Sequence, residues 1–193
     1  MAELSEVLGS QRACRHFRDD PVDDDLIERI LTLAGHAPSA YNSQPWEWIV
    51  VRDAAARAEL AAITESVWVH GARAWAEGAL SDGMRRDVEH GATVGMQAAP
   101  VIVVVCGDTE RCLPNTLGAS VFPAVQNLLL AAADAGLGSA LTTLATLDER
   151  LVALLGLPDH VRAMAVIPIG WPAKPLGPPR RDPVTDHLHL DHY

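Results

Sequence analysis

The chain has 193 residues, 49% of them hydrophobic, and its 25 acidic and 15 basic side chains give a formal net charge of −10. This length predicts a single domain over residues 1–193, and the apolar content is enough for a sizeable core. The acidic balance excludes a general nucleic-acid or anionic-membrane binder, which needs the opposite sign of charge. An anionic ligand must therefore meet a local cluster of cations.

Cysteine usage and apolar patterning favour a soluble cytoplasmic protein. The three cysteines, Cys14, Cys106 and Cys112, form no C-x-x-C pair, which is typical of reduced thiols in a cytosol. The N-terminus has no signal-peptide pattern. We find no apolar run of the roughly 18 residues that a membrane helix needs, because the longest, Leu128–Leu137, is interrupted by Asp134.

The first half of the chain alternates helical and strand patterns. Ala2–Gly9 is expected to be a short helix, and a basic stretch follows. A second helix is expected from an Asp23 N-cap to a stop at Gly35 and Pro38. The aromatic and β-branched run Trp46–Val51 predicts a strand.

The middle of the chain is expected to be helical. Helices are predicted over Ala54–Glu65 and over Val67–Met96, with a break in the second near Gly78–Gly83. The continuous apolar run Val101–Cys106 predicts a strand buried on both faces. A long apolar helix follows over Leu117–Ala135.

The last third predicts two strands separated by a short helix. Strands are expected over Gly138–Leu144 and Arg162–Ile169, with a helix between them capped by Thr146. The proline-rich stretch Trp171–Pro183 predicts an extended loop. Leu188 and its neighbours alternate apolar and polar, which predicts a half-buried final strand.

Together these elements predict an α+β, or mixed α/β, layered domain. The helix predicted over Leu117–Ala135 is so apolar that its coverage within a monomer of this size is an open question. A subunit interface explains this pattern, and an ordinary core helix explains it equally well.

Two arginine clusters stand out in this acidic chain. Arg12, Arg15 and Arg18 fall within seven residues, and Arg180 and Arg181 form a pair near the other end. The planar guanidinium fork binds phosphate with paired donors, so both clusters could converge on one phosphate monoester. Ordinary solvated surface arginines are the alternative reading of the same residues.

The segment Ala37–Trp46 predicts a polar loop between a helix and a strand. Ser39, Asn42 and Gln44 offer hydroxyl and amide groups that both donate and accept. The edge of an isoalloxazine ring requires such a mixture. A self-satisfied turn after a helix would have the same composition.

Four motifs in order make the chain resemble the nitroreductase-like flavoprotein family from about Ser10 to Tyr193. The first, Gln11–Phe17, resembles R-R-S-x-R-x-F, and Ala37–Trp48 resembles A-P-S-x-x-N-x-Q-P-W-x-F. The helix Gln126–Ala132 with the following Gly136–Ser139 also resembles the family. The fourth motif is Val166–Pro172, followed by Pro178-Pro179-Arg180-Arg181.

The resemblance implies a homodimer with two FMN sites at the subunit interface. The implied fold is a central mixed sheet wrapped by helices, with the C-terminal strand exchanged between subunits. The implied activity is FMN-dependent NAD(P)H oxidoreduction: NADH or NADPH reduces FMN by hydride transfer and departs, and a nitroaromatic, quinone or similar electron-poor acceptor then binds. The chemistry belongs to the flavin, so no catalytic protein residue is expected.

The resemblance also assigns cofactor contacts. Arg12 and Arg15 would hold the FMN phosphate beside Ala13, and Arg181 would close the site from the C-terminal side. A second set would lie against the flavin ring. It consists of Pro38, Ser39 and Asn42, expected to serve the other subunit's flavin, and Thr142 and Thr143 at the reactive edge.

Two positions depart from the family motif. Gln11 replaces the usual first arginine, and Ala13 replaces the usual serine. One cation and one hydroxyl are therefore missing from the phosphate site. A charge-assisted hydrogen bond contributes about 1.5–3 kcal/mol, so we expect FMN to dissociate during purification.

Two other functions stay open: a flavin-dependent dehydrogenase or oxidase of a specialised metabolite, and a flavin-binding or storage protein with little turnover. Residues 54–99 are a candidate lid, with Trp68 and Trp75 either stacking on a substrate or simply packing in the core. The tail histidines lack a cysteine or carboxylate that would complete a zinc set, so no metal is expected.

Overall fold

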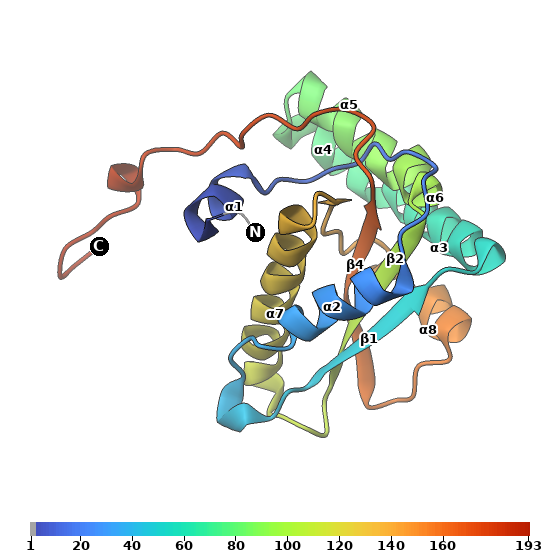
Figure 1. Cartoon of the computed structure of the whole chain (residues 1–193), viewed down its shortest axis with the longest axis horizontal. Coiled ribbons are helices and arrows are strands. Elements are labelled where there is room, and N and C mark those ends of the chain that lie inside the picture. Colours follow the sequence, from blue (N-terminus) through green and yellow to red (C-terminus); the bar gives the residue numbers. More distant parts are fainter. Residues whose placement is uncertain (1–2) are drawn as a thin grey trace.

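A four-stranded antiparallel sheet forms the centre of the computed structural model, which describes residues 3–193 (Figure 1). The strands are β1 (Trp46–Val51), β2 (Val101–Asp108), β3 (Gly138–Ser139) and β4 (Val161–Gly170), in the order β1-β2-β4-β3. The predicted α+β class is confirmed. Among the described residues, parallel pairing is limited to an isolated bridge between Ala13 and Ser139.

Strand β2 is buried on both faces, as its apolar run predicts. Alternate side chains of a strand point to opposite faces. Val103 packs with α2 (Asp24–Ala34) and α7 (Pro114–Asp134) on one face. Val104 packs with α3 (Ala54–Val67) and α8 (Glu149–Leu155) on the other. The sheet therefore lies between two helical layers.

Strand β3 is shorter than the expected Gly138–Leu144. Ser139 pairs with Ile169, and contact with β4 resumes only at Thr142, whose N–H donates to the Val166 carbonyl. In the same register Pro168 would face the residue after Ser139. Proline has no N–H to donate, so the ladder is interrupted there.

Helix α7 begins at Pro114, before the predicted Leu117, with the proline in the first turn where no backbone donor is lost. It is the one helix in the described chain that is long and apolar enough to cross a membrane by length and composition. Its inner side packs on the sheet through residues such as Val121, Val125 and Leu128. Only 44% of its most apolar window is buried.

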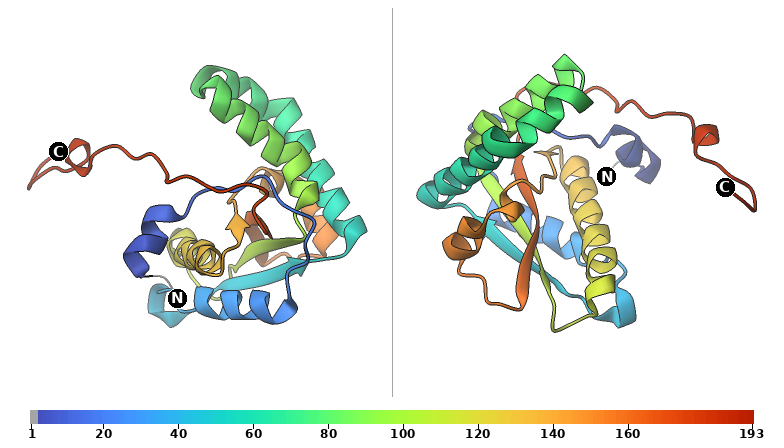
Figure 2. Two further views of the ribbon diagram at one scale, coloured as in Figure 1. Left: turned by 45° about the horizontal axis from the view of Figure 1, so that its top comes forward. Right: turned by 180° about the vertical axis from the view of Figure 1, so that it is seen from behind.

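A helical arm continues from α3 and returns to β2. The outgoing half passes through the π-helical segment η2 (Trp68–Ala72) into α4 (Arg73–Ala79). The returning half consists of α5 (Asp82–His90), the π-helical segment η3 (Gly91–Gly95) and α6 (Met96–Ala98). Figure 2 shows the two halves side by side, extending beyond the sheet. The turn at Leu80–Ser81 confirms the predicted break.

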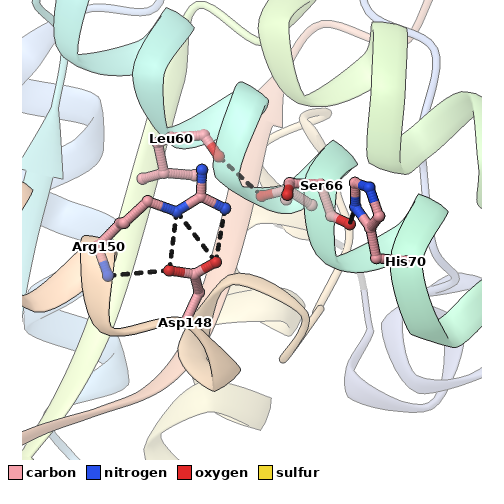
Figure 3. Close-up of polar contacts among 6 residues, drawn as sticks. Leu60, Ser66, His70, Asp148 and Arg150 are labelled. Carbon is pink, nitrogen blue, oxygen red and sulfur yellow. Dashed lines mark hydrogen bonds and ion pairs between the residues drawn. The ribbon is translucent and has the colours of Figure 1, made fainter.

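The start of α8 corrects the Thr146 cap. Thr146 lies in the short helix η4 (Ala145–Leu147), where its hydroxyl donates to the Thr143 carbonyl. Asp148 caps α8 instead, accepting from the Arg150 backbone N–H at 2.9 Å and from its guanidinium (Figure 3). These side-chain hydrogen bonds lower the pKa of Asp148 to about 2.

The chain ends differ from prediction. Helix α1 (Leu4–Ser10) lies where Ala2–Gly9 was expected, and Ala2 falls outside the described residues. The prediction of a half-buried final strand is wrong for the single chain. A short helix, η5 (Val184–Asp186), is followed by an exposed tail in which Leu190 is 80% exposed. The tail projects from the body, where no strand among the described residues lies beside it (Figure 1).

Candidate functional site

The segment between α1 and α2 is fixed to the open edge of the sheet at β3. The Cys14 N–H donates to the Ser139 carbonyl at 2.9 Å, and the Arg18 N–H donates to the Trp171 carbonyl at 2.9 Å. Cys14 and Phe17 are buried. Backbone pairing therefore fixes this segment while its arginine side chains remain at the surface.

Arg15 lies on a face of the returning helical arm made of Asp87, Gly91 and Gly95. A Cβ added at Gly91 would lie 2.4 Å from Arg15 Cδ, and one at Gly95 would lie 2.3 Å from the Arg15 carbonyl oxygen. Arg15 Nη1 donates to Asp87 Oδ2 at 2.6 Å. The sequence did not predict this contact, although spacing by four residues puts these positions on one helix face.

The predicted phosphate residues line one cavity of about 530 Å³. Arg12, Ala13 and Arg15 come from the N-terminal segment, and Arg180 and Arg181 come from the tail. Arg12 Nη1 also donates to the Gly177 carbonyl at 3.1 Å, which ties the tail to the N-terminal segment. We call this space the cation cavity.

A second cavity, of about 320 Å³, lies under the helical arm. Arg15 lines both cavities, and Thr142 and Thr143 line this second one. Most of its lining is apolar, so we call it the apolar cavity. The two tryptophans of the arm also border it: Trp68 is 2% exposed and packs in the core, whereas Trp75 is 68% exposed.

Pro38, Ser39 and Asn42 lie apart from both cavities. Next to them, the Ala40 N–H donates to Ser120 Oγ on the first half of α7, whereas Gln11 lies near Ala133 at its other end. Ala133 lies thirteen helical steps after Ser120, about 20 Å along the axis. One chain therefore brings Thr142 and Thr143 beside Arg15 but leaves Pro38, Ser39 and Asn42 apart from the arginines.

The loop that carries Asn42 has a strained backbone. Tyr41, Asn42 and Gln44 have positive φ values of 55°, 55° and 47°. Such conformations cost of order 1–3 kcal/mol each and persist where surrounding structure imposes them. Tyr41 is 94% exposed, so its side chain contributes little to holding this shape in the single chain.

Titratable groups cluster where the N-terminal segment meets α5. The rings of His16 and His90 stack with centroids 3.9 Å apart, and His16 Nε2 lies 3.4 Å from Asp87 Oδ1. Burial, and then the neighbouring His16, lower the pKa of His90. Burial raises the pKa of the Cys14 thiol and raises that of Cys106 to about 11.

Cys14 and Cys106 are therefore poor nucleophiles at neutral pH, because the thiolate is the reactive form. Within residues 3–193, no three His, Cys, Asp or Glu side chains are grouped so that they could hold a metal ion. In the tail, His189 packs against Tyr193 with ring centroids 4.3 Å apart.

The model of the nitroreductase family matches residues 8–171. The chain belongs to the nitroreductase family. This membership supports a general oxidoreductase role. The match spans the N-terminal arginines, the helical arm and the whole sheet, and it ends before Arg180 and Arg181.

Relatives in the nitroreductase family carry several activities in their names. A Methanothermobacter thermautotrophicus protein whose name proposes an NADH dehydrogenase/NAD(P)H nitroreductase is 33% identical, covering 98% of this chain and 87% of its own. The 5,6-dimethylbenzimidazole synthase of Rhodospirillum rubrum is also 33% identical, covering 88% and 82%. Iodotyrosine deiodinase, solved with FMN and 3-iodo-L-tyrosine, shares the fold with a TM-score of 0.78 at 22% identity, covering 99% and 100%.

Proposed function

We propose that this protein is an FMN-dependent NAD(P)H oxidoreductase that reduces nitroaromatic, quinone or similar electron-poor small molecules. One observation carries the proposal: arginines from both ends of an acidic chain line the cation cavity, and Arg15 joins it to the apolar cavity. A phosphate-bearing, ring-bearing ligand has the matching chemistry.

The cation cavity fits the phosphate of FMN. Arg12, Arg180 and Arg181 supply guanidinium forks, which bind phosphate oxygens with paired hydrogen bonds. Arg15 is held by Asp87, so it contributes fully only if the phosphate competes with that carboxylate. The Arg12 bond to Gly177 positions the tail arginines across the cavity from the N-terminal segment.

We assign the flavin ring to the apolar cavity. Its volume lies at the lower end of the range for small-molecule sites. Thr142 and Thr143 would lie along the ring edge, and the helical arm would exclude water. When bound, FMN would supply hydride transfer between NAD(P)H and the acceptor. The protein would bind and orient the reactants without a nucleophile.

We further propose that the protein works as a homodimer. More than half of the most apolar window of α7 is unburied, and Phe122 on this helix is 39% exposed. The tail beyond Pro183 extends into solvent with exposed Val184 and Leu190. A second subunit that received this tail would cover apolar surface, and it could bring Asn42 to the other flavin.

Two measurements test these proposals. Anaerobic titration of the FMN-loaded protein with NADH or NADPH should bleach the yellow absorbance, and adding a quinone should restore it. Bleaching by neither nucleotide would rule out the reductase. Light scattering should give a dimer mass for the full chain, and a monomer mass at working concentration would overturn the dimer.

The second candidate is a flavin-dependent oxidase or dehydrogenase of a specialised metabolite. The relationship to a 5,6-dimethylbenzimidazole synthase favours it, because that relative has the same 33% identity as the one named for nitroreduction, although over a shorter match. A flavin-storage protein is the third, and the missing arginine and serine at Gln11 and Ala13 count in its favour. FMN that binds but is not bleached by nucleotide would leave these two.

A further inference from the structure

Lys174 is the only lysine in the chain, and it lies in the proline-rich segment that follows β4. Its side chain is exposed. Within residues 3–193 it takes part in no ion pair, whereas Arg15 is paired with Asp87. A lysine ammonium has three donors and no acceptor. Lys174 is therefore a cation whose donors are left for a ligand or for water.

The backbone around Lys174 is held against the N-terminal segment on both sides. The Ala173 N–H donates to the His16 carbonyl at 2.9 Å, and the Gly177 carbonyl accepts from Arg12 Nη1 at 3.1 Å. These two contacts come one residue before Lys174 and three residues after it. The backbone of Lys174 is therefore fixed beside the N-terminal segment, although its side chain is exposed.

A cavity of about 260 Å³ has Lys174 and the N-terminal segment in its lining, and we call it the lysine cavity. It adjoins the cation cavity, because the two share five lining residues: Arg12, Ala13, Arg15, Met84 and Asp87. A further cavity of about 200 Å³ has both Lys174 and Gln11 in its lining. Lys174 therefore lies on the side of the phosphate site where the family's first arginine is missing.

The charge of Lys174 acts on groups at the inner wall of the lysine cavity. Burial raises the pKa of the Cys14 thiol, and Lys174 opposes that rise. Burial, followed by His16, lowers the pKa of His90, and Lys174 adds to the fall. Cys14 and His16 line the cavity, and His90 stacks on His16. The ammonium therefore lies within electrostatic range of the cavity wall.

Positive charge exceeds negative charge around the lysine cavity. Its lining holds the cations of Arg12, Arg15 and Lys174 and, among the described residues, only the Asp87 carboxylate. Asp87 is already engaged, since its Oδ2 accepts from Arg15 Nη1 at 2.6 Å and its Oδ1 lies 3.4 Å from His16 Nε2. An anion that entered from the cation cavity would therefore meet Lys174 as a cation that no carboxylate holds.

We propose that Lys174 binds the phosphate of FMN: its ammonium donates to a phosphate oxygen from the side of the lysine cavity and offsets part of the loss of the arginine at position 11. This rests on the proposed function and names a cofactor contact that the family motifs do not assign. Lysine binds phosphate as a point charge, without the paired geometry of arginine. Its contribution therefore depends on the charge of the phosphate and not on the flavin ring.

The test compares two flavins that differ only in the phosphate. FMN carries it, and riboflavin has the same ring and ribityl chain without it. Dissociation constants for both are measured by quenching of flavin fluorescence in the full chain, without nicotinamide. Lys174→Gln should weaken FMN binding about fivefold to tenfold, the loss of one charge-assisted hydrogen bond that solvent partly screens. Riboflavin binding should change less than about twofold, since no hydrogen bond is lost. The effect on FMN should shrink at high salt.

Two matched variants separate the position of the cation from the net charge. Arg29→Gln removes a cation from an exposed site on α2 that lines none of these three cavities, so FMN binding should be unchanged. Lys174→Arg keeps a cation in place and should retain most of the FMN affinity. Lys174→Gln should leave the Tm of the flavin-free chain unchanged, because no ion pair is broken. Unchanged FMN binding in Lys174→Gln, equal weakening of FMN and riboflavin, or equal weakening in Arg29→Gln would overturn the proposal.

A second readout keeps this proposal separate from the proposed function. Reductive methylation with isotope-labelled formaldehyde gives Lys174 a methyl NMR signal of its own, assigned by its absence in Lys174→Arg. Inorganic phosphate should shift this signal to a saturating value in the flavin-free chain, whereas chloride at equal ionic strength should not. If FMN binds through Lys174 but neither nucleotide bleaches it, the proposal stands and the reductase fails. If phosphate shifts the signal but FMN does not bind, the site takes a free anion and the FMN contact is wrong.

Discussion

The cation cavity and the apolar cavity share Arg15 but are built in opposite ways. The first is formed by exposed segments from the two ends of the chain, and charged residue types alone indicate its chemistry. The second is enclosed by the helical arm, and its character depends on glycines and on one buried indole. Residue identity alone therefore predicts the charge of a cavity, whereas the shape of an enclosed cavity depends on which helix faces pack together.

The largest expected effect comes from displacing Arg15, the residue that lines both cavities. In Gly95→Ala the new Cβ would meet the Arg15 carbonyl oxygen at 2.3 Å, and a backbone atom cannot swing aside as a side chain does. Overpacking of this kind costs about 1–3 kcal/mol in free energy of unfolding. We expect that loss in urea unfolding, together with weaker FMN binding.

Gly78→Ala is the matched control on the same arm. A Cβ at Gly78 meets nothing within 4 Å. Replacing a helical glycine by alanine stabilises by about 0.5–1 kcal/mol. Equal stability changes in Gly78→Ala and Gly95→Ala would show that Arg15 does not pack on the arm as described.

The next largest effect should come from restoring the family's arginine and serine in the cation cavity, with the apolar cavity left unchanged. Gln11→Arg with Ala13→Ser adds a cation and a hydroxyl at positions that line the cation cavity. One charge-assisted hydrogen bond corresponds to at least about a tenfold tighter Kd for FMN, measured by quenching of flavin fluorescence.

Leu147→Arg controls for net charge in that comparison, because it adds one cation at a site 73% exposed on η4, away from the cavity. Binding that tightens equally in Leu147→Arg would mean that overall charge, and not the cavity, sets FMN affinity. In the FMN-free double variant, the affinity of a small acceptor for the apolar cavity, measured by tryptophan fluorescence, should be unchanged. That result would show that the two substitutions act on the cation cavity alone.

The same contrast explains what could be predicted from sequence. The continuous apolar run of β2 requires two covered faces, and the arginine clusters require a shared anion, so both could be predicted locally. The end of β3 could not, because it depends on Pro168 lying opposite in the neighbouring strand. The tail strand after Pro183 also needs a neighbour that one chain does not supply.

The contact of Arg15 with α5 and η3 was missed for a related reason. Asp87, Gly91 and Gly95 share one helix face, but that pattern does not predict which segment of the chain packs against it. The pairing of Cys14 with Ser139 and of Arg18 with Trp171 brings the N-terminal segment alongside the arm. Trp68 and Trp75 also looked equivalent seven residues apart, and their different burial is decided by the packing of the arm.

A smaller effect is expected from freeing Arg15. Asp87 places a carboxylate beside the cation cavity and pairs with Arg15. Asp87→Asn keeps the shape and removes the competing charge, so FMN should bind a few-fold tighter at low salt, with the gain reduced at high salt. Both side chains are partly exposed, so stability should fall by no more than about 1 kcal/mol. Weaker FMN binding would instead mean that Asp87 positions Arg15 for the phosphate.

The smallest effect concerns pH at the contact between the N-terminal segment and α5, where His90 stacks on His16. Burial, followed by His16, lowers the pKa of His90, with Asp87 opposing and Lys174 assisting. In the unfolded chain His90 takes up a proton near its ordinary pKa of 6.5, and in the folded chain it does so only at lower pH. The free energy of unfolding should therefore fall as the pH drops below about 6.5.

His90→Gln removes this titration, so the variant should lose less stability than the original chain between pH 7 and pH 5. The quantity to compare is the slope of unfolding free energy against pH. The absolute free energy is less informative, because the substitution also removes the stack on His16. Urea unfolding at several pH values measures both slopes. If unfolding free energy changes with pH equally in both chains, His90 is not desolvated by its contact with His16. In that case α5 covers the N-terminal segment less closely than the stacked rings indicate.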